Sequence, residues 1–460
     1  MRSARAKVLH TLGGTPLINH VLRAVRTLRP ERLVVVVGHQ AEEVRRAAVP
    51  EGGGALIAVQ EERRGTGHAV RAAAAHFSGF TGDVVILLGD VPLLSPSTLS
   101  GFVASHRARG AALSVLTAEM DDPSGYGRVI RGPSGRVERI VEERDASDRE
   151  REVREVNTGI FCARSEFLFP ALTRLNNDNA QAEYYLTDIV ALGVRQGLAV
   201  EATVAANPTE VAGVNSREEL ARMEKSLRER ICGRWMAAGV TLEDPNTTYI
   251  DDQVVIGEDT IVGPNTHLKG TTVIGRSCRI DGSAYIRDSQ LGDGVHVRFC
   301  VVLSDSRLGD GTEVGPFAHL RAGAALAPRA EVGNFVEVKK STLGERSKAK
   351  HLAYLGDAEV GRDTNIGAGT ITCNYDGFRK HRTKIGDRVQ VGSDSTLVAP
   401  VTLHDDVYVA TATTVRKDVP AGALVFNERR EAVRKGWVEQ KRRREAGKTA
   451  QTDAAETAAK

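Results

Sequence analysis

The sequence has few cysteines and no long apolar run. Its cysteines are scattered, with neither a CxxC pair nor a Cys/His spacing typical of a metal site, at Cys162, Cys232, Cys278, Cys300 and Cys373. This pattern is typical of reduced thiols, so we expect a cytoplasmic protein. Neither a signal peptide nor an apolar run of about 18 residues is visible, so we expect no membrane span.

An excess of charge of either sign is also missing. The formal net charge is +3 over 460 residues, which gives no electrostatic support for binding of nucleic acid. Basic residues gather only in a C-terminal extension, residues 427–460, where acidic residues are interleaved and a solvated segment is the simplest interpretation. From about Ala446 the extension lacks periodicity, and we expect it to be disordered.

An aliphatic residue recurs at every sixth position from about Tyr249 to Val415, often followed by glycine. The longest uninterrupted run is Ile250, Ile256, Val262, Leu268, Ile274, Ile280 and Ile286. A six-residue period is typical of a parallel β-helix, in which three short strands form a triangular coil with one aliphatic side chain per face pointing inward. An ordinary sandwich would instead show a period of two. We therefore predict a β-helical rod over residues 239–426.

The preceding part of the chain has the pattern of an α/β domain, over residues 1–215. The apolar runs 33–37 and 84–88 are typical of strands buried on both faces of a mostly parallel sheet. In such folds ligands bind beyond the carboxyl ends of the strands, which is where Asp90 falls. Ser216 and Glu219 form a capping-box pattern that begins a predicted linker helix over residues 216–238.

Two local features of the first domain are ambiguous by themselves. The turn Gly65-Thr66-Gly67 before a predicted helix offers backbone N–H groups to an anion or a base edge, but glycine turns often only redirect the chain. An aspartate at a strand end, such as Asp90, is often only a helix cap. Neither feature alone defines a site.

Taken with other motifs, however, the first domain resembles a sugar-nucleotide pyrophosphorylase. The motifs are Gly125-Tyr126-Gly127-Arg128, Glu142, Asn157-Thr158-Gly159 and Gly213-Val214-Asn215. Followed by a hexapeptide rod, it resembles the bacterial bifunctional family of N-acetylglucosamine-1-phosphate uridylyltransferases and glucosamine-1-phosphate N-acetyltransferases, from about Met1 to Trp437. Segments 351–357 and 365–377 are the most specific. The resemblance implies a Rossmann-like α/β nucleotidyltransferase with a mixed sheet, its first strand missing, followed by a left-handed parallel β-helix.

In the rod, the resemblance implies an acetyltransferase that uses acetyl-CoA and glucosamine-1-phosphate. It places His351 as the general base, which suits an amine that must lose a proton before it attacks a thioester. It assigns Arg321 and Lys339 to a cationic clamp for the sugar phosphate, and Tyr354 and Asn365 to the sugar. Positions on the acetyl-CoA side are Ala368, Asn374, Tyr375, Ser393, Thr411 and Arg429. Thr411 and Glu428-Arg429 depart from the family pattern.

The segment from Cys373 to Lys384 interrupts the six-residue count. An interruption of this kind projects from the coil as a loop. In the family such a loop helps to form a site shared between subunits, so we expect a homotrimer.

In the first domain, the resemblance implies transfer of a uridylyl group from UTP to N-acetylglucosamine-1-phosphate. It assigns Mg2+ to Asp90 and Asn215, whose oxygen atoms suit a hard cation that bridges phosphates. The implied UDP-N-acetylglucosamine-binding positions are Lys7, Gln60, Gly65, Thr66, Gly127, Glu142, Asn157 and Asn215.

Family members open with a strand and a Leu-Ala-Ala-Gly-x-Gly-Thr-Arg-Met loop, and this sequence starts at what matches the last residue of that loop. We therefore expect an unpaired edge inside the sheet, a weaker cradle for the triphosphate and slow uridylyl transfer by the chain as written. An impaired enzyme and a start assigned too late both fit this pattern.

Two other functions are consistent with parts of the sequence. A different sugar nucleotidyltransferase with a purely structural hexapeptide tail does not explain His351 and its neighbours. A non-catalytic scaffold or regulatory subunit fits the missing loop but not the intact rod motifs. Release of thiol from acetyl-CoA would separate all three.

Overall fold

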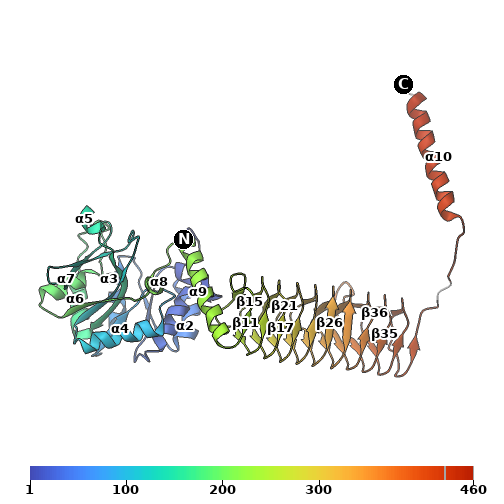
Figure 1. Cartoon of the computed structure of the whole chain (residues 1–460), viewed down its shortest axis with the longest axis horizontal. Coiled ribbons are helices and arrows are strands. Elements are labelled where there is room, and N and C mark those ends of the chain that lie inside the picture. The colour runs from blue at the N-terminus through green and yellow to red at the C-terminus, as the bar shows by residue number, and fades with distance from the viewer. Residues whose placement is uncertain (429–430, 459–460) are drawn as a thin grey trace. The chain divides into compact units, whose positions relative to one another are not determined.

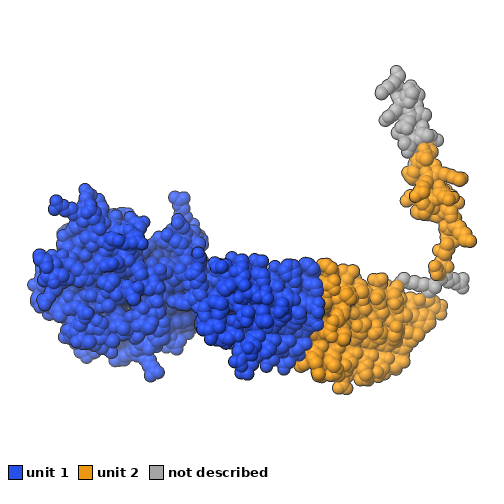
Figure 2. All heavy atoms as spheres, viewed as in Figure 1, with its two compact units in different colours: residues 1–322 blue, residues 323–460 orange. Residues whose placement is uncertain are grey.

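The computed structural model describes residues 1–428 and 431–458, in two compact units of residues 1–322 and 323–460 (Figure 2). The division falls inside the predicted rod rather than at its start near residue 239. Stacked coils contact only their neighbours, so contacts are equally sparse at every coil boundary. Arg429 lies outside the described residues. The predicted domain boundaries stay predictions.

Unit 1 begins with an α/β region that alternates strands and helices (Figure 1). Its elements are η1 (Lys7–Leu9), β1 (Thr11–Leu12), β2 (Thr15–Pro16), α1 (Leu17–Arg26), β3 (Val34–Val37), α2 (Ala41–Gly52), β4 (Leu56–Val59), α3 (Thr66–Ala73), η2 (Ala74–Phe77), β5 (Asp83–Ile86), α4 (Pro96–Ala108), β6 (Leu113–Glu119), β7 (Arg128–Arg131), β8 (Val137–Val141), α5 (Asp148–Arg151), β9 (Glu155–Arg164), α6 (Ser165–Thr173), α7 (Asp188–Arg195), β10 (Val200–Val204), α8 (Pro208–Val211) and α9 (Arg217–Ala237).

The main sheet of this region is mixed, as predicted. Its strand order is β10-β6-β9-β7-β8, with β5 also paired to β9; β10 runs parallel to β6, whereas β5, β6 and β7 are antiparallel to β9. The fully buried Leu113, Val115, Phe161 and Leu168 lie in its core. In the described part of the chain, β3 and β4 form a separate parallel pair. The predicted break in the sheet is therefore confirmed.

Helix α9 begins at the predicted capping box. The Ser216 hydroxyl accepts a hydrogen bond from the Glu219 backbone N–H at 3.0 Å, and the Ser216 N–H donates to the Glu219 carboxylate at 2.9 Å. Met223, Leu227 and Ile231 bury one face of the helix.

The rod strands of unit 1 form three parallel sheets, ordered β11-β14-β17-β20-β23, β12-β15-β18-β21-β24 and β13-β16-β19-β22. Ile250 pairs with Leu268 and Leu268 with Ile286, so three six-residue steps make one coil. The strands are β11 (Thr241–Leu242), β12 (Tyr249–Ile250), β13 (Val255–Ile256), β14 (Ile261–Val262), β15 (His267–Lys269), β16 (Val273–Ile274), β17 (Arg279–Ile280), β18 (Tyr285–Arg287), β19 (Gln290–Leu291), β20 (His296–Val297), β21 (Val302–Ser304), β22 (Arg307–Leu308), β23 (Glu313–Val314) and β24 (His319–Leu320).

Unit 2 continues the same architecture, and a left-handed β-helix is thus confirmed as the fold of the predicted rod. Its sheets are ordered β26-β29-β32-β35-β38-β40, β27-β30-β33-β36-β39 and β25-β28-β31-β34-β37. The strands are β25 (Ala325–Leu326), β26 (Glu331–Asn334), β27 (Glu337–Lys339), β28 (Thr342–Leu343), β29 (Lys348–His351), β30 (Tyr354–Gly356), β31 (Ala358–Val360), β32 (Asn365–Ile366), β33 (Ile371–Cys373), β34 (Thr383–Ile385), β35 (Gln390–Val391), β36 (Thr396–Val398), β37 (Val401–Leu403), β38 (Tyr408–Val409), β39 (Thr414–Val415) and β40 (Leu424–Val425).

The C-terminal extension differs from its prediction. Helix α10 (Trp437–Ala458) covers most of the segment expected to be disordered from about residue 446. Alanine, glutamate, glutamine, lysine and arginine are strong helix formers, and this intrinsic preference outweighs the lack of an apolar stripe. Among the described residues, no helix has the length and apolar character that crossing a membrane requires.

Candidate active sites

His351 lies exposed at a corner of unit 2, at the end of β29. It is in register with Asn334 at the end of β26, one coil earlier, and its Nδ1 is 3.0 Å from the Asn334 Oδ1. The carbonyl oxygen of an amide only accepts, so Nδ1 carries a proton, and in the neutral ring Nε2 has the lone pair. Gly333 is required beside this pair, because a Cβ there would overlap the Lys350 carbonyl.

Two expected sugar contacts flank this corner. Asn365 lies on β32, whose register with β29 pairs it with Lys348, and Tyr354 begins β30 just after the corner. A Cβ at residue 356 would overlap the Tyr354 hydroxyl, so Gly356 leaves the space that the ring occupies. Lys339 ends β27, and Arg321 is an exposed residue directly after β24 of unit 1. The cationic clamp stays a prediction.

The expected acetyl-CoA positions Ala368, Ser393 and Thr411 occupy the same corner in successive coils. Backbone hydrogen bonds link the turns: Gly369 N–H donates to Leu352 O at 2.9 Å, Asp394 N–H to Ala368 O at 2.7 Å, and Ala412 N–H to Ser393 O at 2.8 Å. The structure thus brings these three positions into one row that starts at the histidine corner. In the sequence, the first and the last of them are 43 residues apart.

The predicted interruption of the coil is a loop between β33 and β34. Asp376 organises it by accepting from the N–H groups of Phe378 and Arg379 and from His381 Nε2, each at 2.7 Å. These bonds, led by that from Arg379, lower the pKa of Asp376 to about 2. Asn374 donates to the Asp357 carboxylate at 2.5 Å, and the Tyr375 hydroxyl to Gly377 O at 2.6 Å.

In unit 1, Lys7, Asp90 and Asn215 converge although they lie far apart in sequence. The Lys7 ammonium forms an ion pair with the Asp90 carboxylate and donates to the Asn215 Oδ1 at 2.9 Å. Val214 N–H donates to Asp90 O at 3.0 Å, which joins the two segments. The two expected metal ligands therefore point their oxygens at one cationic group.

The turn at Gly65-Thr66-Gly67 is held by a segment that the sequence analysis did not identify. Gly67 N–H donates to Tyr184 O at 2.8 Å, and Leu186 N–H donates to the Thr66 hydroxyl at 3.1 Å. Gly65 has φ +99°, and a Cβ there would lie 2.7 Å from Tyr184 O. Gln60, directly after β4, donates from Nε2 to Gly65 O at 3.1 Å.

Gly127, directly before β7, Glu142, directly after β8, and Asn157 on β9 form a third cluster. Asn157 N–H donates to Gly127 O at 2.8 Å, and a Cβ on Gly127 would lie 3.3 Å from the Glu142 carboxylate. Burial raises the pKa of Glu142, and the Thr187 hydroxyl opposes this by donating to its carboxylate at 3.0 Å. Segment 184–187 thus contacts both this cluster and the glycine turn.

Asn334, Tyr184 and Thr187 contact expected site residues or the glycine turn, and the sequence analysis assigned them no role. For Asn334 a signal was present, because it precedes His351 by one 17-residue coil. The loop 184–187 has no periodicity that could have indicated its contacts.

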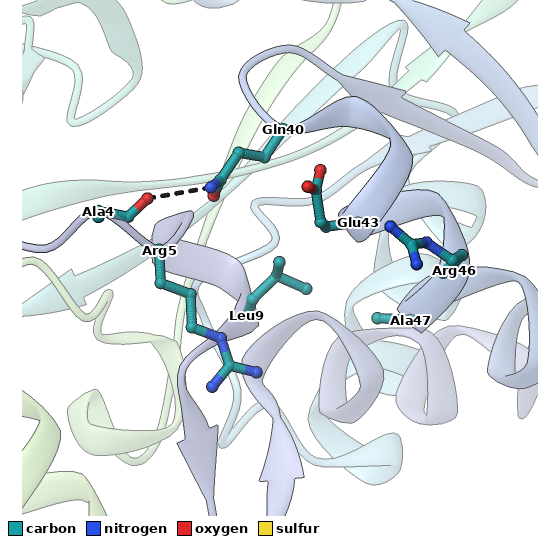
Figure 3. A pocket seen from close by; sticks show the side chains of 7 residues that line it. All are labelled: Ala4, Arg5, Leu9, Gln40, Glu43, Arg46 and Ala47. Atoms are coloured by element: carbon teal, nitrogen blue, oxygen red, sulfur yellow. Dashed lines mark hydrogen bonds between the residues drawn. The ribbon is translucent and has the colours of Figure 1, made fainter.

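A hollow of about 610 Å3 lies between the N-terminal segment and α2 (Figure 3). Gln40 spans its edge by donating to Ala4 O at 3.0 Å. Of the expected site residues, none lines it. Within residues 1–428 and 431–458, no group of three or more His, Cys, Asp or Glu side chains is placed to hold a metal.

Comparisons with known proteins show the family of the chain. Residues 1–190 match the family model of the MobA-like NTP transferase domain. The chain is 50% identical over 438 residues to the bifunctional protein GlmU of Pelobacter propionicus, covering 95% of each chain. It is 50% identical over 456 residues to that of Geobacter metallireducens and 45% over 437 residues to that of a Nostoc species, again with 95% of each chain covered.

The fold and the matches define a transferase in which a nucleotidyltransferase region precedes a hexapeptide-repeat acyltransferase rod. Because relatives are about half identical along nearly their whole length, the chain belongs to the family of bifunctional GlmU proteins. It is an enzyme, both an acetyltransferase and a uridylyltransferase.

Proposed function

We propose that the enzyme makes UDP-N-acetylglucosamine in two steps. The rod transfers an acetyl group from acetyl-CoA to glucosamine-1-phosphate, and the N-terminal region then transfers a uridylyl group from UTP to the resulting N-acetylglucosamine-1-phosphate. The observation that carries the proposal is the exposed His351 imidazole, oriented by Asn334 at the start of the row Ala368, Ser393 and Thr411.

In the acetyl transfer, His351 acts as the general base. Its Nε2 takes a proton from the sugar ammonium, and the freed amine attacks the thioester carbonyl carbon. A C–N bond forms as the C–S bond breaks, and the thiolate leaves and takes up a proton to give free CoA. The proton on Nδ1, held by the Asn334 carbonyl, keeps Nε2 basic. Tyr354, Asn365 and the cations Arg321 and Lys339 position the sugar phosphate.

The row along the corner receives the coenzyme. Ala368, Ser393 and Thr411 line its path, and Asn374 and Tyr375 of the loop between β33 and β34 belong to the same proposed set. Arg429 belongs to the same proposed set.

In the uridylyl transfer, the sugar phosphate attacks the α-phosphorus of UTP and pyrophosphate leaves. Lys7 offsets the charge that develops on the phosphate. Gln60, Gly65 and Thr66 bind uracil, and Gly127, Glu142 and Asn157 bind the sugar, while segment 184–187 holds the two groups in one arrangement.

Asp90 and Asn215 fit a Mg2+ site. Their oxygens already converge on one ammonium group, and Mg2+ takes few protein ligands because it keeps several waters. When bound, the ion would offset the negative charge of the triphosphate.

A homotrimer and a cytoplasmic location complete the proposal. Phe378 at the tip of the loop is 91% exposed and Leu352 beside His351 is 64% exposed, which favours a neighbouring subunit that covers them. All five cysteines are free thiols, as is typical of a reducing compartment.

A pair of variants tests the two activities against each other. We expect His351→Ala to lower thiol release from acetyl-CoA with glucosamine-1-phosphate by about 10²- to 10⁴-fold and to leave pyrophosphate release from UTP unchanged. Asp90→Ala should lower pyrophosphate release on the order of 10²-fold and leave thiol release unchanged. Each variant is thus the folding control for the other.

The same assays decide against the proposal if the pattern differs. Pyrophosphate release without any thiol release by the wild type would indicate a structural tail. Neither activity would indicate a scaffold.

A further inference from the structure

The side-chain amide of Gln60 is held by two partners. Its backbone N–H donates to Val37 O at 2.8 Å, which fixes the residue at the end of the β3–β4 pair. Its Nε2 lies 3.1 Å from Gly65 O and 3.1 Å from the Nδ1 of His68. Both partners belong to the glycine turn or to the first turn of α3, so the amide is bound to the segment that it faces.

These contacts fix the orientation of the NH2 and carbonyl ends of the Gln60 side-chain amide. The Gly65 carbonyl is an acceptor only, so the group beside it must be the NH2 end of Gln60. An amide nitrogen carries two hydrogens, and the second is directed to His68 Nδ1, which must therefore accept. His68 then carries its proton on Nε2, and Gln60 presents its carbonyl Oε1 as the end available to a ligand.

His68 is itself held in place. Its ring stacks on Tyr184 with centroids 6.3 Å apart and an interplanar angle of 29°, and the Arg71 guanidinium lies 4.9 Å from the Tyr184 ring centre. Tyr184 belongs to the segment that receives Gly67 N–H. The acceptor at Nδ1 is thus part of a packed group rather than a mobile surface side chain.

We infer that His68 is a positioning residue that makes the base site select uracil over cytosine, an inference that rests on the proposed uridylyltransferase function. Uracil carries a hydrogen on N3, which an oriented Gln60 Oε1 accepts. Cytosine N3 instead carries a lone pair, which the same oxygen repels. Both acceptors, cytosine N3 and Gln60 Oε1, then lack a donor. Without His68 Nδ1, one amide hydrogen loses its partner, and rotation of the Gln60 amide to suit cytosine becomes less costly.

A matched pair of variants tests the inference in the full-length enzyme. His68→Leu removes the acceptor, whereas His68→Asn keeps an acceptor oxygen near the position of Nδ1. We expect His68→Leu to lower the ratio of kcat/KM for UTP over CTP by about 5- to 10-fold, the effect of one hydrogen bond, mainly through KM for the nucleotide. His68→Asn should stay within about threefold of the wild type on the same reasoning.

Calorimetric binding of UTP and CTP to the same proteins gives a readout independent of turnover. Thiol release from acetyl-CoA reports that each variant is folded, and KM for the sugar phosphate should not change. The role of His68 is overturned if the UTP preference of His68→Leu stays within about twofold of the wild type. It is also overturned if His68→Asn loses this preference as fully as His68→Leu does. Neither outcome affects the uridylyltransferase proposal. If the wild type neither transfers from nor binds UTP in preference to CTP, the uridylyltransferase proposal fails and the inference fails with it.

Discussion

At the scale of single residues, the sites depend on polar groups whose partners fix their chemical form. Asn334 sets the tautomer of His351, and Gly65 O sets the orientation of the Gln60 amide. Burial raises the pKa of Glu142. In each case the neighbouring group, rather than the residue type alone, determines what the ligand meets.

Glu142 predicts a pH dependence of sugar binding. Because burial raises its pKa above 4.5, the folded protein takes up this proton at a higher pH than an ordinary glutamate does. We expect KM for N-acetylglucosamine-1-phosphate in uridylyl transfer to rise as the pH falls through this raised pKa, since a protonated carboxyl accepts sugar hydroxyls less well.

The control for this prediction is Glu142→Gln. It should raise KM about 10-fold at neutral pH and remove the rise at low pH, because the amide does not titrate in this range. A wild-type KM that stays constant down to pH 4.5, the ordinary value, would contradict the prediction.

At the scale of elements, strand register places the residues proposed for acetyl transfer. Asn334 and His351 meet because β26 and β29 pair directly, and Gly333 allows this approach. We expect Gly333→Ala to destabilise the protein by about 1–3 kcal/mol, since its Cβ meets backbone that cannot rotate away, and to lower acetyl transfer by displacing Asn334. Thermal unfolding and thiol release measure the two effects.

Gly233→Ala in α9 is the matched control. A Cβ there meets no atom within 4 Å, and alanine is the better helix former, so stability should stay equal or increase slightly. If both substitutions had the same effect, the close approach at Gly333 would not explain the loss.

The elements also show how much the sequence could predict. The six-residue period predicts the coils correctly because Ile250, Leu268 and Ile286 must all point inward. The convergence of Lys7 with Asn215, 208 residues away, could come only from a family resemblance, because no local pattern encodes it. The contact between Gln60 and His68 depends on turn geometry that eight residues of sequence do not reveal.

At the scale of the whole molecule, exposed apolar residues beside His351 and in the loop between β33 and β34 predict assembly. Phe378, Tyr375 and Leu352 expose between 59% and 91% of their surface in the isolated chain. We expect light scattering to give a mass of three 49.5 kDa chains. Phe378→Asp should shift this mass toward the single chain and lower acetyl transfer without affecting pyrophosphate release.

Phe80→Asp is not an equivalent test, because Phe80 is half-buried and packs against Phe77 and Arg32. Val433→Asp is a better control for Phe378→Asp, because Val433 is 77% exposed and lies on the C-terminal extension. A monomer with full acetyl transfer would exclude a site shared between subunits.

The row of turns at the histidine corner also fixes the distances at which a bound molecule can contact it. Neighbouring strands lie about 4.8 Å apart, so Ala368, Ser393 and Thr411 stand one, two and three such intervals from His351. An acyl carrier that reaches the imidazole along this row has to match whole intervals. The β-helix can therefore be adapted to a longer or shorter carrier only by gaining or losing complete coils.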